Sequence, residues 1–208
     1  MIKITHKVSG AVLLEVDEPS LEGVRLTGAR LQFADLSGAN LQDANFGSAD
    51  LRDVDFSGAN LQGAVLRAAC MNSANMSGAN CTKGDFTDAR LVGADFSNAI
   101  LTGANLRYAQ LTGAKLVSAD LCGADLSMCD LRANLSQAKL KKADLRAADL
   151  SGANLMGADL QEANMTGAKL TGAKMLRTNL QGATDTQGRR AVAAAAVAKP
   201  ARPWWQFW

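Results

Sequence analysis

Residues 38–64 read GANLQDANFGSADLRDVDFSGANLQGA. A large apolar residue occupies every fifth position of this stretch, beginning with Leu41 and Phe46. A small residue, usually Ala, stands two positions before each central residue, and Asp or Asn stands directly before it. Two polar or small residues follow, the second often Gly. The pentad continues over 21–131 without a break and over 135–180, so we predict one solenoid of many small units.

The period of five excludes the commoner architectures. On an α-helix the central residues would be rotated by about 140° from one repeat to the next, so they would form no apolar stripe. On a flat strand an odd period sends successive central residues to opposite faces. Both the Ala and the central residue reach one interior only if the chain is extended for about three residues and then turns a corner, where Gly is well suited.

These residues closely resemble the pentapeptide-repeat family, whose pattern is A(D/N)LXX, and the resemblance spans 21–183. It implies an all-β fold, a right-handed quadrilateral parallel β-helix with four pentads per coil. The 23 central residues from 21 to 131 and 10 more from 135 to 180 give 33 pentads, hence about eight coils and a rod of roughly 40 Å. With four pentads per coil, residues 20 apart stack, and one interior ladder contains Leu41, Leu61, Cys81, Leu101 and Leu121.

The two ends of the chain depart from the repeat and divide it into three parts. Residues 1–20 contain IKITHKV and AVLLEV around Ser9-Gly10, which predicts a β-hairpin that caps the first coil. Residues 21–183 form the β-helix. Residues 184–208 are an Ala-rich segment, irregular or briefly helical, followed by an aromatic tail.

One irregularity interrupts the repeat. The central residues Leu131 and Leu135 are four positions apart, which predicts a tightened corner or a local kink. Charge changes at the same place: residues 21–130 carry 12 acidic and 8 basic side chains (net −4), whereas residues 131–183 carry 4 acidic and 8 basic (net +4). A basic cluster follows directly, which is either a solvated face or a docking patch for an acidic partner: Lys139, Lys141, Lys142 and Arg146.

The last residues hold an aromatic cluster, Trp204, Trp205, Phe207 and Trp208. Such rings are too apolar to stay in water without cost. Three interpretations stay open: the tail folds over the last coil as a cap, it anchors a partner or a second copy, or it inserts into a membrane interface beside Arg202 and Lys199.

The sequence offers no catalytic set, and we predict a protein that is not an enzyme. His6 is the single histidine and has no Cys or second His beside it, so we expect neither catalysis nor a metal site there. Cys81 and Cys129 fall on inward positions, and Cys70 and Cys122 on outward ones. No phosphate-binding loop is present, and we expect no cofactor.

The resulting hypothesis is a protein-binding or scaffolding module with an aromatic anchor, which has a protein partner and, as a further option, forms a homodimer through its C-terminal end. The family resemblance implies an alternative, because some members mimic duplex DNA and bind type II topoisomerases such as gyrase. Those members are strongly acidic, whereas this solenoid is neutral. An envelope- or membrane-associated assembly role is the third option. We expect no nucleic-acid binding, do not favour a membrane, and expect a cytoplasmic location because no leader or long apolar stretch is visible.

Overall fold

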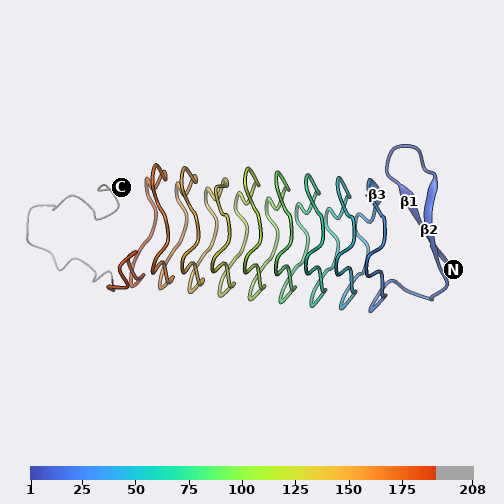
Figure 1. Cartoon of the computed structure of the whole chain (residues 1–208), viewed down its shortest axis with the longest axis horizontal. Helices are drawn as coiled ribbons and strands as arrows, with labels where there is room; N and C mark the ends of the chain where they lie inside the picture. Colours follow the sequence, from blue (N-terminus) through green and yellow to red (C-terminus); the bar gives the residue numbers. More distant parts are fainter. Residues whose placement is uncertain (191–208) are drawn as a thin grey trace, which may run out of the picture.

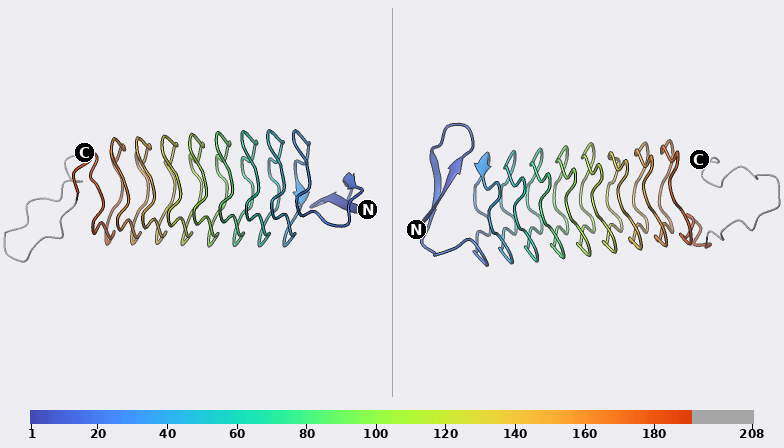
Figure 2. Two further views of the ribbon diagram at one scale, coloured as in Figure 1. Left: turned by 90° about the horizontal axis from the view of Figure 1, so that it is seen from below. Right: turned by 180° about the vertical axis from the view of Figure 1, so that it is seen from behind.

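The computed structural model describes residues 1–190, which form a straight rod with a hairpin at its N-terminal end (Figure 1). The hairpin consists of β1 (Ile2–His6) and β2 (Val12–Val16), which pair antiparallel. The two further views show the same stack of coils from other sides (Figure 2). The all-β, right-handed quadrilateral β-helix that the family resemblance implies is confirmed.

Parallel pairing between residues one coil apart defines four flat faces of the rod. We name each face after its first residue: the Arg25, Arg30, Asp35 and Asn40 faces. The Arg25 face runs through nine paired residues, ending at Thr184, and each of the other three runs through eight. The solenoid therefore contains eight complete coils and the first face of a ninth, in agreement with the predicted number.

Each corner of the solenoid except the one after Leu131 is a four-residue turn whose third residue has a positive φ. At the corner after Leu36, the Ala39 N–H donates to the Leu36 carbonyl at 3.2 Å, and Gly38 has a φ of 63°. A positive φ at the third residue is a feature of type II turns, in which glycine is favoured at that position. Bulkier residues occupy the same place at other corners, as Tyr108 does with a φ of 60°.

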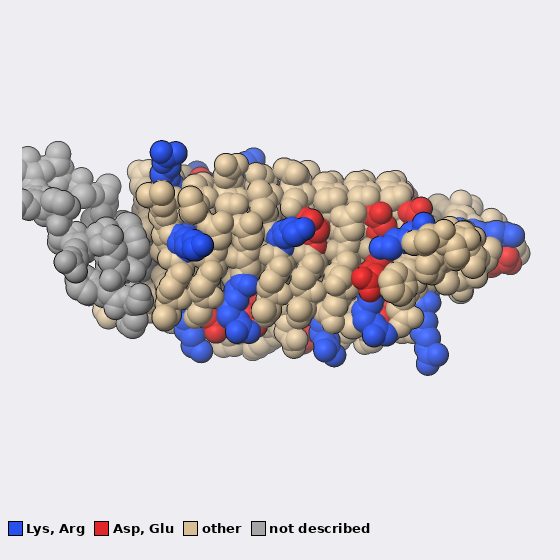
Figure 3. Space-filling model, turned by 90° about the horizontal axis from the view of Figure 1, so that it is seen from above, with Lys and Arg blue, Asp and Glu red and all other residues tan. Residues whose placement is uncertain are grey.

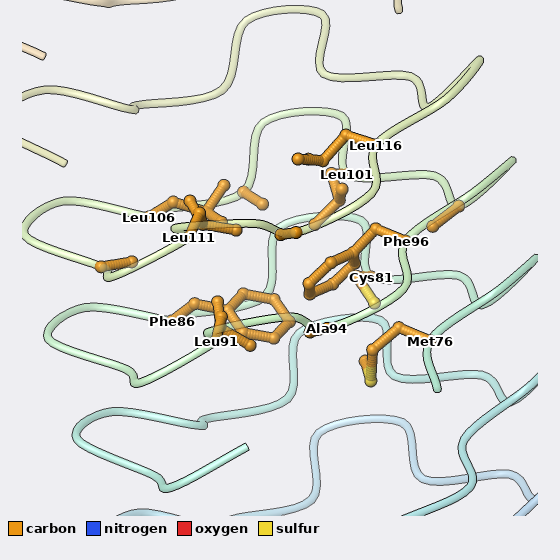
Figure 4. Close-up of a cluster of buried hydrophobic side chains, with 14 of the residues drawn as sticks. Met76, Cys81, Phe86, Leu91, Ala94, Phe96, Leu101, Leu106, Leu111 and Leu116 are labelled. Atoms are coloured by element: carbon orange, nitrogen blue, oxygen red, sulfur yellow. The ribbon is translucent and has the colours of Figure 1, made fainter. Parts of the chain in front are cut away.

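The interior is a dry stack of the central residues and the alanines beside them (Figure 4). The five residues of the predicted ladder are completely buried: Leu41, Leu61, Cys81, Leu101 and Leu121. Two coils hold a pair of phenylalanines from opposite faces, and the rings of Phe86 and Phe96 meet edge to face with centroids 6.1 Å apart. Burial of each leucine contributes about 2 kcal/mol, so the many small units supply a continuous core.

The Asp or Asn before each central residue points outward and shapes the turn that follows. The Asp55 carboxylate accepts a hydrogen bond from the backbone N–H of Ser57 at 2.9 Å, and Asn105 does the same for Arg107 at 3.2 Å. Either side chain supplies the accepting oxygen of such a turn. This shared role explains why Asp and Asn exchange along the chain.

The missing residue after Leu131 is absorbed within one corner. The Ala133 N–H donates to the Leu131 carbonyl at 2.8 Å, so this turn is one residue shorter than the others. Pairing continues on all four faces, with a separation of 19 in place of 20 for one coil, as in Lys115 with Asn134. The tightened corner is confirmed, and the ladders pass it without a break.

The hairpin covers only one face of the first coil. β1 pairs antiparallel with β3 (Ala34–Asp35), which belongs to the Asp35 face. His6 has a structural role here: its Nδ1 accepts hydrogen bonds from the backbone N–H groups of Val8 and Ser9, both at 3.2 Å, and its ring lies 5.5 Å from that of Phe33. The predicted hairpin is confirmed, and it leaves the first-coil edges of the other three faces uncovered.

At the other end the chain turns back on itself. Asp185 N–H donates to the Arg189 carbonyl at 2.7 Å, and Arg190 pairs antiparallel with Thr184. The Ala-rich segment and the aromatic tail, with the candidates Trp204, Trp205, Phe207 and Trp208, lie outside the described residues. In the part of the chain from 1 to 190, no helix has the length and apolar character that crossing a membrane requires.

Candidate interaction surface

The basic cluster predicted from the sequence spans two adjoining faces. Lys139 lies on the Asn40 face, Lys141 and Lys142 form the corner that follows, and Arg146 forms the corner at the far side of the Arg25 face. The structure therefore brings Lys141, Lys142 and Arg146 to the borders of one face.

Acidic side chains neutralise most of this cluster. Lys139 Nζ lies 3.6 Å from Asp120 Oδ2, and Lys142 Nζ lies 3.8 Å from a Glu162 oxygen. Arg146 holds Asp144 through two nitrogens, with Nη2 2.6 Å from Oδ2. These pairs are exposed, so each contributes little to stability. Lys141 has no ion-pair partner among residues 1–190.

A second feature lies on the same corner as Arg146 and consists of two large exposed apolar side chains. Tyr108 and Met128 occupy the third turn position in successive coils, and their side chains are 46% and 52% exposed. Arg107 and Arg146 occupy the second turn position at this corner. Arg107 directly precedes Tyr108, and Arg146 lies in the coil that follows Met128. We call these four residues the Tyr108 corner.

Contacts within the Tyr108 corner hold the ring and the guanidinium together. The Arg107 guanidinium lies 5.3 Å from the centre of the Tyr108 ring, a cation–π contact. Arg107 Nε lies 3.7 Å from Asp125 Oδ2 on the Arg25 face. The corner thus presents an aromatic ring, a thioether and two guanidinium groups on a backbone fixed by the coils on either side.

Sequence reasoning missed Tyr108 and Met128 because turn positions accept many residue types. The signal that finds them is the stacking of residues 20 apart, which places Met128 on Tyr108 once four pentads per coil are assumed. The chain has a single Tyr, and it lies at this corner.

The remaining chemically active side chains form no site in the described residues. Burial raises the pKa of the Cys81 thiol to about 12 and also raises that of Cys129, so neither is a nucleophile at neutral pH. Burial and a hydrogen bond to Asp120 raise the pKa of Cys122. No group of three His, Cys, Asp or Glu residues between 1 and 190 is arranged to hold a metal ion.

On the side of the rod that Figure 3 shows, Lys and Arg side chains are scattered over a mostly uncharged surface, and several of them lie beside Asp or Glu. A four-sided β-solenoid of pentads, with a polar, charge-balanced surface and a few exposed apolar side chains, defines a repeat protein of the right-handed parallel β-helix class.

The chain belongs to the pentapeptide-repeat family: the model "Pentapeptide repeats" matches it in overlapping stretches from residue 20 to residue 184. It is similar to HetL, a pentapeptide repeat protein involved in heterocyst differentiation regulation from the cyanobacterium Nostoc sp. PCC 7120. The two sequences are 34% identical, the match covers 82% of this chain and 88% of HetL, and the TM-score is 0.44. It is also similar in fold to trypsin-treated QnrB1, a plasmid-mediated fluoroquinolone resistance protein, with 20% identity, 80% and 86% covered, and a TM-score of 0.52. No curated protein sequence matches the chain.

Proposed function

We propose that this protein is a non-catalytic binding module that docks a protein partner on the Tyr108 corner. The observation that carries the proposal is the exposed pair Tyr108 and Met128, flanked by two arginines, on a rod whose outward positions are otherwise mainly small or polar. Tyr, Met and Arg are enriched in protein interfaces, and Tyr and Arg are common hot spots.

Rigidity of the support adds to this argument. The backbone N–H of Tyr108 donates to the Ser127 carbonyl at 3.3 Å, and that of Met128 donates to the Arg146 carbonyl at 2.9 Å. Both turns rest on buried central residues, Leu106 and Leu126. A partner that docks here loses little free energy to ordering of this surface.

The test compares two double variants as bait. Tyr108→Ser with Met128→Ser removes the apolar pair. Ser48 occupies the same turn position three coils before Tyr108 with a φ of 56°, so serine fits this position. Val92→Ser with Ile100→Ser is the matched control, because both side chains are exposed, at 40% and 45%, and lie away from the corner. We expect a specific partner to bind the wild type and the control equally and to be lost, by tenfold or more in affinity, with the corner variant.

Equal loss of the partner with both variants, or retention with both, would contradict the proposal.

The proposal also includes the aromatic tail as a second anchor, with apolar area supplied by Trp204, Trp205, Phe207 and Trp208. A chain that ends at Ala198 separates the two contributions, since we expect it to keep the partner of the Tyr108 corner.

A further inference from the structure

The N-terminal end of the rod has an open backbone edge. β1 covers the Asp35 face, but the N–H and C=O groups of Arg25 make no hydrogen bond within residues 1–190. In each later coil, the equivalent residue of this face bonds to the preceding coil through its N–H and C=O groups. Asn45, for example, donates its N–H to the Val24 carbonyl at 2.8 Å. An uncovered edge of this kind accepts one added strand.

A cleft lies beside this edge, between β2, the linker that follows it and the first strand of the Arg25 face. Its volume is about 670 Å³. The apolar side chains that line it come from both walls: Leu14, Val16, Val24 and Leu26. The charged side chains that line it are mostly acidic: Glu15, Asp17, Glu18, Glu22 and Arg25.

The charge of the cleft favours a basic occupant. Four carboxylates and one guanidinium give a formal net charge of −3 (−4 + 1). Glu15 is paired with Lys3 at 3.3 Å, whereas Asp17, Glu18 and Glu22 have no ion-pair partner in the described part of the chain. A basic segment would meet at least three unpaired carboxylates above an apolar floor.

The hairpin limits the size of that occupant. β1 and β2 stand over the first coil at this end of the rod (Figures 1 and 2). The end of a second rod would need all four edges free to continue the stack. The cleft therefore admits a single extended segment and excludes a whole coil.

The chain itself contains a segment of matching chemistry. Residues 199–208, KPARPWWQFW, carry two cations, no acidic residue and four aromatic rings. Lys199 and Arg202 complement the carboxylates, and the rings supply apolar area for the floor.

Geometry decides which copy supplies the segment. The Arg25 face rises through eight steps from Arg25 to Thr184, roughly 38 Å at the usual strand spacing. Nine residues from Arg190 to Lys199 reach at most about 32 Å when fully extended. Lys199 therefore cannot reach the cleft of its own chain, so a segment that seats Lys199 against these carboxylates comes from another copy.

We infer that the N-terminal cleft binds residues 199–208 of a second copy, which joins the rods head to tail. The inference rests on the proposed role of the tail as an anchor and names the site that the anchor occupies. The contact is heterologous, because one chain offers its cleft and the next offers its tail. Such contacts grow with concentration into open chains of molecules.

Analytical ultracentrifugation of full-length chains tests the inference. We expect the average mass of the wild type to rise with concentration beyond that of a dimer and to fall at high salt. Glu18→Lys with Glu22→Lys should weaken association about tenfold or more, because like charges then face each other. The matched control, Asp88→Lys with Glu162→Lys, makes the same charge change at exposed positions outside the cleft and should associate as the wild type does.

Charge exchange gives the sharpest readout. Lys199→Glu with Arg202→Glu should weaken association to a similar extent, and mixing these chains with the Glu18→Lys/Glu22→Lys chains should restore it. A wild type that stays monomeric, or Glu18→Lys/Glu22→Lys chains that associate as strongly as the wild type, overturns the inference. A closed dimer through the C-terminal ends gives the latter result. Capture of a partner by the Tyr108 corner is measured separately, so either proposal can fail while the other stands.

Discussion

At the scale of single residues, the outward Asp and Asn side chains determine how each turn is made. Three of them occur in an Asp-Leu-Arg triplet, where the arginine folds back on the carboxylate two residues earlier. In the triplet of Asp130 and Arg132, the guanidinium nitrogens lie 2.8 and 2.6 Å from the two carboxylate oxygens. The surface of the rod is therefore held by local contacts that repeat along it.

These contacts predict loss of stability in acid. The hydrogen bond from Arg132 lowers the pKa of Asp130 to about 2, below its ordinary value of 3.8, and Arg52 lowers the pKa of Asp50 in the same way. A carboxylate with a lowered pKa stabilises the folded state above pH 4, and this contribution is lost as the pH falls from about 4 to about 2. The urea concentration at the midpoint of unfolding should be constant above pH 5 and should fall between about pH 4 and about pH 2. The fall should be smaller in Asp130→Asn, and an unchanged slope would contradict this origin.

Gly84 is the residue whose substitution the packing opposes most clearly. It replaces the usual Ala beside a central residue, and a Cβ placed on it would lie 2.9 Å from Phe86 Cε2. Gly84→Ala should lower the free energy of unfolding by about 1–3 kcal/mol, the usual range for overpacking. In a Phe86→Leu background the same change should cost almost nothing, because Leu accompanies Ala throughout the repeat. Chemical denaturation of the four chains measures this coupling, and equal costs in both backgrounds would exclude it.

At the scale of elements, the corner is the unit that adapts while the faces stay fixed. The shortened turn at Ala133 keeps every ladder in register. Inserting Gly between Arg132 and Ala133 restores a full pentad, and we expect it to leave the melting temperature nearly unchanged. Inserting Gly between Ala104 and Asn105, within a face, should unfold neighbouring coils because it shifts the inward residues outward. Circular dichroism melts of both chains provide the comparison, and similar melts would contradict the distinction.

The elements also show what the sequence reveals and what it leaves out. The period of five predicts the buried ladder and the corner, because every unit must reach the same interior. The hairpin follows from alternation around Ser9-Gly10 and is confirmed. The sequence does not predict that β1 covers a single face, because this depends on the pairing of Thr5 with Asp35 across the end of the rod. The Tyr108 corner also escapes prediction, because turn positions accept any side chain that tolerates a positive φ.

At the scale of the whole molecule, balanced charge argues for specific docking and against a general electrostatic partner. The acidic first part and the basic second part of the solenoid cancel, −4 against +4. Half of the Lys and Arg side chains of residues 21–183 pair with a carboxylate, as Arg67 does with Asp85 at 3.7 Å. The surface carries no field of one sign that would resemble the phosphate backbone of DNA.

This balance predicts that the protein does not act on topoisomerases as a mimic of DNA. Purified gyrase should supercoil plasmid at the same rate with and without the protein at micromolar concentration. Inhibition of supercoiling, or protection of gyrase from a quinolone, would favour the DNA-mimic alternative and would show that shape outweighs charge here.

The most direct test of the central claim is photo-crosslinking from the Tyr108 corner in cells. A photoreactive phenylalanine analogue replaces Tyr108 or Met128 in one pair of chains and Val92 or Ile100 in another. We predict that both corner positions crosslink to the same protein and that neither of the other positions does. The same crosslinks from all four positions, or none from the corner beside a clear product from Val92 or Ile100, would contradict the account.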